Sequence, residues 1–216
     1  MTPEEKLRRQ LLASRRYYRA VRRPLDDGGS SSVAVPTYAT WNPLDKDAGV
    51  TLSNGDLYAR GSTKSVRATQ GKSTGKYTFE ITYPASFNSL YAGFGDAGFS
   101  LANTVGNIAT SASYGISAYT KAGVTSFGTA PATSAVPFMF ALDLDAGKAW
   151  LCKANVWANS TLGGAFDIDN PVFTWTPTTM FPACTPLNAT HDCIANFGAS
   201  AFTNTVPNGF NSGWYI

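Results

Sequence analysis

The stretch 139-MFALDLDAGKAWLCK-153 can be interpreted either as a metal-binding site or as a structural element. Asp143, Asp145 and Gly147 have the alternating spacing with which a calcium-binding loop opens, and the same residues suit the turn of a β-hairpin. A calcium loop would continue with oxygen ligands at fixed later positions and end on a bidentate glutamate. Those positions fall on Gly147, Ala149, Leu151 and Ala154, which offer no carboxylate.

A hairpin explains the same stretch better. Apolar residues alternate before and after the acidic positions, as they do in strands that bury one face. Asp145 to Gly147 then supply the turn. We therefore expect two antiparallel strands whose core-facing side chains are Phe138, Phe140, Leu142, Leu144, Ala149 and Leu151.

The rest of the chain beyond residue 33 has the same period of two. Charged residues make up only 14% of the 216 residues, against a typical ~25%, and short apolar runs alternate with Gly, Ser, Thr and Asn. Many short strands with this density of turns predict an all-β, antiparallel β-sandwich or jelly roll. In 76-KYTFEITYP-84 one face would consist of Tyr77, Phe79, Ile81 and Tyr83.

Four blocks follow one another in an order that resembles a SPRY domain, of the kind found in bacteriophage structural proteins. They are TWNPLDKDAGVTLSNGDLYAR, SVRATQGKSTGKYTFEIT, FALDLDAGKAWLCK and IANFGASAFTNTVPNGF, and the resemblance covers roughly residues 38–211. It implies a concanavalin A-like sandwich that binds protein segments, and sometimes glycans, through loops at one edge, without enzymatic activity. KANVWANSTLGG replaces the usual Lys-Asn-Gly turn, so residues 153–180 are the expected specialised surface.

The N-terminal region has a different composition. Residues 1–23 contain eight basic and two acidic residues, whereas the rest contains nine basic and twelve acidic ones. Thr2, Pro3 and Glu5 form a helix-start signal. We expect a basic amphipathic α-helical anchoring arm over 1–24, a flexible linker over 25–36 and the sandwich over 37–216.

The predicted arm combines a narrow apolar stripe with a broad basic face. Such a helix is typical of a segment that docks into a partner's groove while its arginines meet carboxylates or phosphates. A solvated helix without a partner is the alternative. The residues expected to anchor the arm are Leu7, Arg8, Leu11, Arg15, Arg16, Tyr18, Arg19, Arg22 and Arg23.

Aromatic residues in or beside predicted loops form the candidate binding surface of the sandwich. Exposed aromatics anchor protein partners and stack on sugars, although each could equally belong to the core. The candidates are Phe87, Tyr91, Tyr119, Trp157 and Trp175.

The sequence gives little support for a catalytic site or a metal-binding site. Glu80 is the only glutamate after residue 5 and, within a strand, is expected to make a structural hydrogen bond, whereas a glycosidase needs two carboxylates. Asp167 and Asp169 lack a third ligand at fixed spacing, and His191 lacks a nucleophile motif. We expect no catalytic residues, no metal and no cofactor.

Three cysteines are too few for a disulfide framework. Reduced, buried thiols are the main expectation, although Cys184 and Cys193 could meet across a hairpin. The first 30 residues contain no apolar run long enough for a signal peptide. We therefore expect synthesis in a host cytoplasm and release by lysis within a virion.

The leading hypothesis is a non-enzymatic phage virion protein. Residues 1–24 would attach it, in several copies, to capsid or tail proteins, and the sandwich would decorate the particle or touch a host glycan or protein. The alternatives are an arm that binds nucleic acid inside a particle, a glycan-active enzyme that uses Glu80, and an arm that lies on a membrane.

Overall fold

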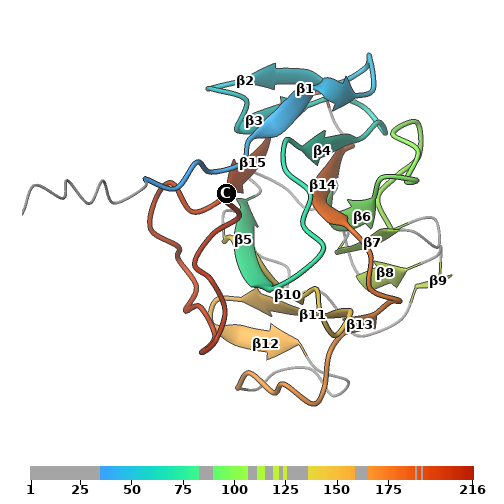
Figure 1. Ribbon diagram of the computed structural model, residues 1–216. Helices are drawn as coiled ribbons and strands as arrows, with labels where there is room; N and C mark the ends of the chain where they lie inside the picture. The colour runs from blue at the N-terminus through green and yellow to red at the C-terminus, as the bar shows by residue number, and fades with distance from the viewer. Residues whose placement is uncertain are drawn as a thin grey trace, which may run out of the picture. The chain divides into compact units, whose positions relative to one another are not determined.

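The computed structural model describes residues 35–82, 90–106, 111–114, 119–121, 124–125, 136–158, 165–187, 189–190 and 192–216. One compact unit spans Pro36–Ile216, and its described residues form strands and turns without an α-helix (Figure 1). The predicted arm over 1–24 and nearly all of the linker over 25–36 lie outside the described residues. Within the described part of the chain, no helix is long and apolar enough to cross a membrane.

The strands form two antiparallel sheets. The first sheet has the order β1 (Trp41–Lys46), β4 (Val66–Ala68), β14 (Met180–Pro186), β6 (Leu90–Asp96), β7 (Ser111–Tyr114), β8 (Tyr119–Lys121) and β9 (Val124–Thr125). The second has the order β12 (Val156–Ala158), β11 (Lys148–Lys153), β10 (Phe138–Asp143), β5 (Lys76–Thr82), β15 (Cys193–Asn196), β3 (Tyr58–Arg60) and β2 (Thr51–Ser53), with β13 (Phe173–Thr174) paired to β11.

The stretch 139–153 is a hairpin. β10 and β11 pair in unbroken register from Phe138 opposite Lys153 to Asp143 opposite Lys148. Gly147 ends the turn with φ +61°, a backbone conformation in which a side chain is strained, and a Cβ there would overlap the carbonyl oxygen of Trp175. The hairpin prediction is confirmed.

The main core lies between the two sheets, and the predicted alternation places the residues correctly. Phe138, Phe140, Leu142 and Leu144 belong to it, as do Ala149 and Leu151 from the returning strand. Phe79 and Ile81 of β5 face the same core, where the Phe79 and Phe140 rings stack with centroids 5.0 Å apart.

The opposite face of the β10–β11 hairpin is also buried. Met139, Ala141, Trp150 and Cys152 form a second apolar cluster beneath more distant segments, which contribute Phe166, Phe202, Val206 and Phe210. The central strands are thus covered on both faces, so they read as continuous apolar runs.

Trp157 belongs to this second cluster, and its place on a binding loop was predicted wrongly. It lies in β12, is 6% exposed and packs edge-on against Phe166 at 4.9 Å between ring centroids. The polar residues around it in the sequence suggested a loop, but the β11–β12 turn returns the chain to the sheet edge. There the residues around 166 and 210 supply its apolar cover.

The N-terminal and C-terminal ends of the sandwich meet. Thr37 N donates to Ile216 O at 3.2 Å, and Ile216 N donates to Thr37 O at 3.1 Å. Tyr38 and Tyr215 form an isolated antiparallel bridge, with ring centroids 5.5 Å apart. These contacts close the main core over Trp214, which is fully buried.

The three cysteines are free and buried, as expected. Cys184 lies in β14 of the first sheet, whereas Cys193 lies in β15 of the second. Burial raises the pKa of Cys193 well above its ordinary value, and the neighbouring Cys184 raises it further. Burial also raises the pKa of Cys152 to about 12, so Cys152 and Cys193 are poor nucleophiles at neutral pH.

Candidate binding surface

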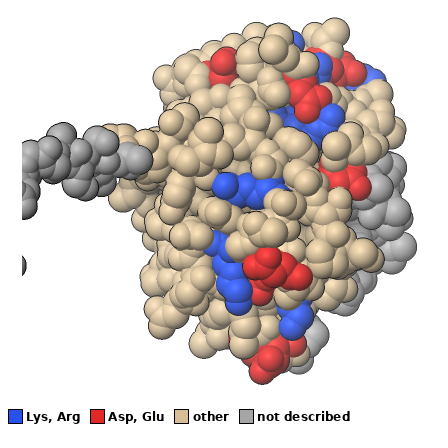
Figure 2. All heavy atoms as spheres, in the orientation of Figure 1, with Lys and Arg blue, Asp and Glu red and all other residues tan. Residues whose placement is uncertain are grey.

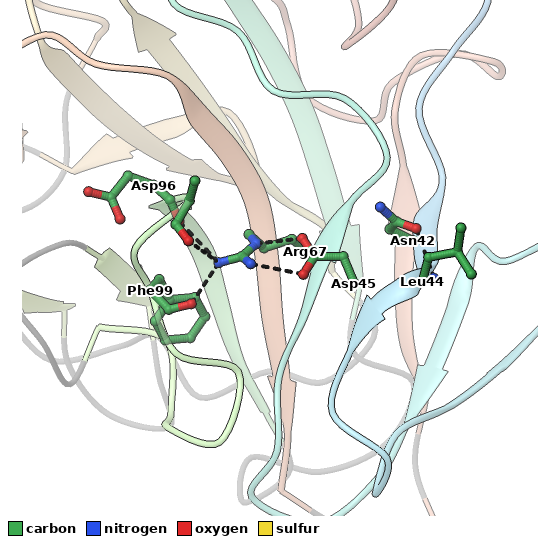
Figure 3. Close-up of polar contacts among 7 residues, drawn as sticks. Asn42, Leu44, Asp45, Arg67, Asp96 and Phe99 are labelled. Carbon is green, nitrogen blue, oxygen red and sulfur yellow. Dashed lines mark hydrogen bonds and ion pairs between the residues drawn. The ribbon is translucent and has the colours of Figure 1, made fainter.

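A buried arginine organises one face of the first sheet. Arg67 lies in β4, is 8% exposed and forms a two-pronged ion pair with Asp45 of β1 (Figure 3). Its Nε donates to Asp45 Oδ2 at 2.7 Å and its Nη2 to Asp45 Oδ1 at 2.8 Å. The planar fork of arginine matches a carboxylate in this way, whereas a lysine presents a single point charge.

The remaining guanidinium nitrogen holds the chain that follows β6. Arg67 Nη1 donates to the carbonyl oxygens of Phe99 at 2.6 Å, Asp96 at 3.2 Å and Ala97 at 3.3 Å (Figure 3). The ring of Phe181 lies beneath the guanidinium, and its centroid is 5.8 Å from Arg67 Cζ. One side chain thus connects the edge strand β1 to residues 96–99.

Ser65, two residues earlier and on the same face, holds the next part of that segment. Its Oγ donates to Asn103 O at 2.6 Å and lies 2.7 Å from Thr185 Oγ1, while its backbone N donates to Leu101 O. Thr185 Oγ1 in turn accepts the backbone N–H of Val105 at 2.8 Å. Residues 96–106 therefore lie across the outer face of β4 and β14, fixed along their length.

The edge strand β1 presents an exposed apolar side chain beside this network. Leu44 is 95% exposed, and its backbone N–H donates to Asn42 Oδ1 at 2.9 Å. The preceding Pro43 and the register shift within β1 make the edge a poor template for adding another strand. We call Leu44, Asp45 and residues 97–100 the β1–β4 surface.

The β1–β4 surface combines an exposed apolar side chain with a charged one on a fixed backbone. Its one large exposed apolar group, Leu44, stands next to a carboxylate that keeps partial exposure, 31% for the Asp45 side chain. Its backbone is held by side chains that are themselves buried, so partner binding would cost little ordering entropy. The sequence contains the signal for Arg67 in SVRATQG, but nothing in the sequence alone pairs it with Asp45.

The three predicted aromatic residues whose side chains are described, Tyr91, Trp157 and Trp175, lie on different parts of the sandwich. Trp175 is half-buried and packs on the main core, 5.1 Å from the ring of Phe94. Tyr91 is half-buried in β6, on the face opposite to Ala92 and Phe94. Tyr119 lies in β8, where only its backbone is described. Phe87 lies outside the described residues.

Glu80 makes the structural hydrogen bonds that were expected of it. It is 2% exposed and accepts from Asn204 N at 2.7 Å, Asn204 Nδ2 at 2.7 Å and Thr203 N at 3.0 Å. These bonds fix the C-terminal segment over the second cluster. Both carboxylate oxygens are thereby engaged, which is a scaffold role rather than that of a proton-transfer group.

Asp167 and Asp169, the other candidate acidic or metal-binding residues, lie in a turn that their hydrogen bonds stabilise. Asp167 Oδ1 accepts the Asp169 N–H at 3.0 Å and Oδ2 accepts from Asn170 Nδ2 at 2.6 Å. The bond from Asn170 is the main reason that the pKa of Asp167 lies below its ordinary value. Among the described residues, no three His, Cys, Asp or Glu side chains are grouped to hold a metal, and His191 lies outside them.

Several solved structures share the fold of this sandwich. The TRIM65 PSpry domain superposes with a TM-score of 0.55 at 13% identity, covering 74% of this chain and 92% of that chain. The SPRY domain of human HERC1 gives 0.54 at 13% identity, covering 72% and 95%. The chain has the SPRY fold.

A third structure, stonustoxin, gives a TM-score of 0.53 at 14% identity, and the match covers 74% of this chain and 27% of the toxin chain. No protein-family model and no curated protein sequence matches the chain. The SPRY resemblance seen in the four sequence blocks is therefore confirmed at the level of the β-sandwich fold.

Proposed function

We propose that the chain is a non-enzymatic binding module in which a SPRY sandwich is displayed on a phage virion. Residues 1–24 attach the sandwich to a capsid or tail protein, and the sandwich decorates the particle or contacts a host surface. The support for the binding role is the SPRY fold together with the rigid β1–β4 surface. The support for the phage context is the sequence resemblance of the four blocks.

The observation that carries the proposal is the arrangement around Arg67. A buried, fully hydrogen-bonded arginine fixes β1 and residues 96–99 relative to each other, while it leaves Leu44 and part of Asp45 exposed. A pre-organised backbone lowers the ordering cost of binding, so an exposed apolar side chain on it can serve as an anchor for a protein partner. Glu80, the candidate acid of a glycan-cleaving alternative, is instead occupied by three backbone and amide donors.

Deletion of residues 1–24 tests the attachment. Particles would be purified on density gradients from cells that produce either the full chain or the truncated chain. The truncated chain should remain folded, as judged by cooperative unfolding in urea, and should be absent from the particle band. A truncated chain that still joins particles, or a full chain that never does, contradicts the proposal.

A matched variant of the arm distinguishes docking through apolar side chains from attraction between charges. Replacing Leu7 and Leu11 by Ser removes both leucines from the predicted apolar stripe and keeps every arginine. Loss of particle binding in this variant indicates that the arm docks into a protein groove. Binding that persists and weakens steeply as the salt concentration rises indicates nucleic acid instead.

A further inference from the structure

A cluster of half-buried tyrosines lies where the ends of the sandwich meet. The Tyr77 and Tyr215 rings are 6.2 Å apart, and the Tyr215 and Tyr38 rings are 5.5 Å apart, both edge-to-face. Lys72, in the segment between β4 and β5, places its Nζ 4.2 Å from the centroid of the Tyr77 ring. We call Tyr38, Tyr77, Tyr215 and Lys72 the tyrosine–lysine face.

The segment that contains Lys72 crosses the front of the molecule in Figure 1 between the two sheets. Backbone bonds fix it there, because Lys72 N donates to Met180 O and Met180 N donates to Lys72 O, both at 2.9 Å. Figure 2 shows basic atoms in the middle of this side, surrounded by uncharged residues. The ammonium group of Lys72 is thus presented from a fixed backbone.

The Lys72 ammonium lacks a counter-charge. Among the described residues, no carboxylate lies within ion-pair distance of it. Two acidic residues that contact the following residues of this segment are engaged there, since Asp143 pairs with Lys76 at 2.9 Å and Asp145 Oδ2 accepts the Gly75 N–H at 3.1 Å. Burial lowers the pKa of Lys72, so an incoming anion would recover the charge stabilisation that desolvation removes.

Several side chains around the tyrosine–lysine face form hydrogen bonds. The Tyr215 hydroxyl donates to Asn211 Oδ1 at 3.3 Å, and the exposed Asn211 also donates from Nδ2 to Lys76 O. Gln70 donates from Nε2 to Thr37 O, while its Oε1 is buried without a hydrogen-bond partner. Aromatic rings interleaved with amides and hydroxyls suit the alternating C–H and O–H surface of a sugar better than an apolar peptide side chain.

We infer that the tyrosine–lysine face binds an acidic glycan, with a sugar carboxylate on Lys72, beside Tyr77, and the sugar ring against Tyr215. The inference rests on the proposed function, because it assigns a host-surface ligand class to the displayed sandwich. A chain that joins particles but binds no acidic glycan overturns this inference alone. A chain that binds the glycan but never joins particles overturns only the proposed function.

The test uses the full chain and an alginate hexasaccharide, with a neutral dextran hexasaccharide as control. Because the arginines of residues 1–24 attract any polyanion, the readout is the NMR signals of the Trp214 indole and the Tyr77 ring, which lie 5.6 Å apart. Alginate should shift both signals saturably and dextran should not. Shifts confined to arm residues, absence of shifts at millimolar alginate, or equal shifts with dextran overturn the inference.

Two matched variants sharpen the assignment. Lys72→Gln should weaken the binding that these signals report by about tenfold, the loss of one charge-assisted contact. Lys64→Gln removes the same charge at the far loops, where Lys64 Nζ donates to Ala102 O, and should leave affinity unchanged. Equal effects of both variants, or an aspartate hexapeptide that binds as tightly as alginate, would show recognition of charge alone and overturn the glycan assignment.

Discussion

Arg67 and Asp45 share two parallel hydrogen bonds, Nε to Oδ2 at 2.7 Å and Nη2 to Oδ1 at 2.8 Å, across neighbouring strands of the first sheet. The third nitrogen of the same guanidinium binds three backbone carbonyls. Removal of the arginine would therefore leave a carboxylate and several carbonyl oxygens without their donors. Such uncompensated groups cost more than the intact pair contributes.

Arg67→Met should lower the free energy of unfolding in urea by about 2–4 kcal/mol. It should also speed amide hydrogen exchange in residues 97–103, whose anchor is lost. Arg67→Lys should recover little of this stability, because one ammonium group cannot reproduce the paired hydrogen bonds of the planar guanidinium. Arg60→Met is the control: it breaks the exposed pair with Asp192 at 2.7 Å and should have a much smaller effect. Equal losses in the two methionine variants would contradict the anchoring role.

Glu80→Gln should lower the free energy of unfolding by about 1–3 kcal/mol, because the new amide nitrogen would face a backbone donor. The affected contacts are those of Thr203 and Asn204, which hold the C-terminal segment over the second cluster. Asn204→Ala should be similarly harmful, and the double variant should show less than the sum of both losses. Strict additivity would mean that the two residues act independently.

Ala154→Gly should raise the free energy of unfolding by about 0.5–1 kcal/mol, measured from the midpoint in urea. Ala154 has φ +52° in the β11–β12 turn, which a residue with a Cβ adopts at a cost and glycine does not. Asn155, with φ +61°, is the matched control, because its Oδ1 accepts the Thr205 N–H at 2.6 Å. Asn155→Gly should therefore fail to stabilise; stabilisation by both would assign the strain to the turn as a whole.

Asp143→Asn should remove a pH-dependent part of the stability. Burial raises the pKa of Asp143, but the Ala146 N–H at 3.0 Å and Lys76 at 2.9 Å together bring it below its ordinary value of 3.8. A carboxyl with a lowered folded-state pKa stabilises above the unfolded-state pKa and loses that contribution as the pH falls. The gap in unfolding free energy between wild type and variant should shrink below pH 3.8. A gap that stays constant down to strongly acidic pH would exclude this role.

The sequence predicted the parts of the fold that depend on neighbouring residues. The alternation of Phe138, Phe140 and Leu142 places them in the main core, and Gly147 marks the turn. The second cluster was missed because its cover comes from Phe166 and the 202–210 region, far along the chain. A period of two also cannot tell a strand buried on both faces from one buried on a single face.

The candidate surfaces depend on contacts that no local pattern reveals. Arg67 meets Asp45 and Phe99 across 22 and 32 positions of the chain. Tyr38 and Tyr215 come together only because the ends of the sandwich pair. Trp157 was selected as an aromatic residue in a predicted loop, whereas its exposure depends on which distant segment folds over it. The position of Glu80 within a strand did predict correctly that it makes structural hydrogen bonds.

The reciprocal hydrogen bonds between Thr37 and Ile216 bring the two ends of the sandwich together, which makes it suitable for insertion as a domain into another protein. A unit whose entry and exit strands lie side by side can be grafted into a surface loop of another protein without stretching its host. The same closeness permits circular permutation, in which a short peptide joins Ile216 to Thr37 and new ends open at the exposed Asn54–Gly55 turn. A chain in which the strands follow one another in a permuted order should therefore form the same sandwich.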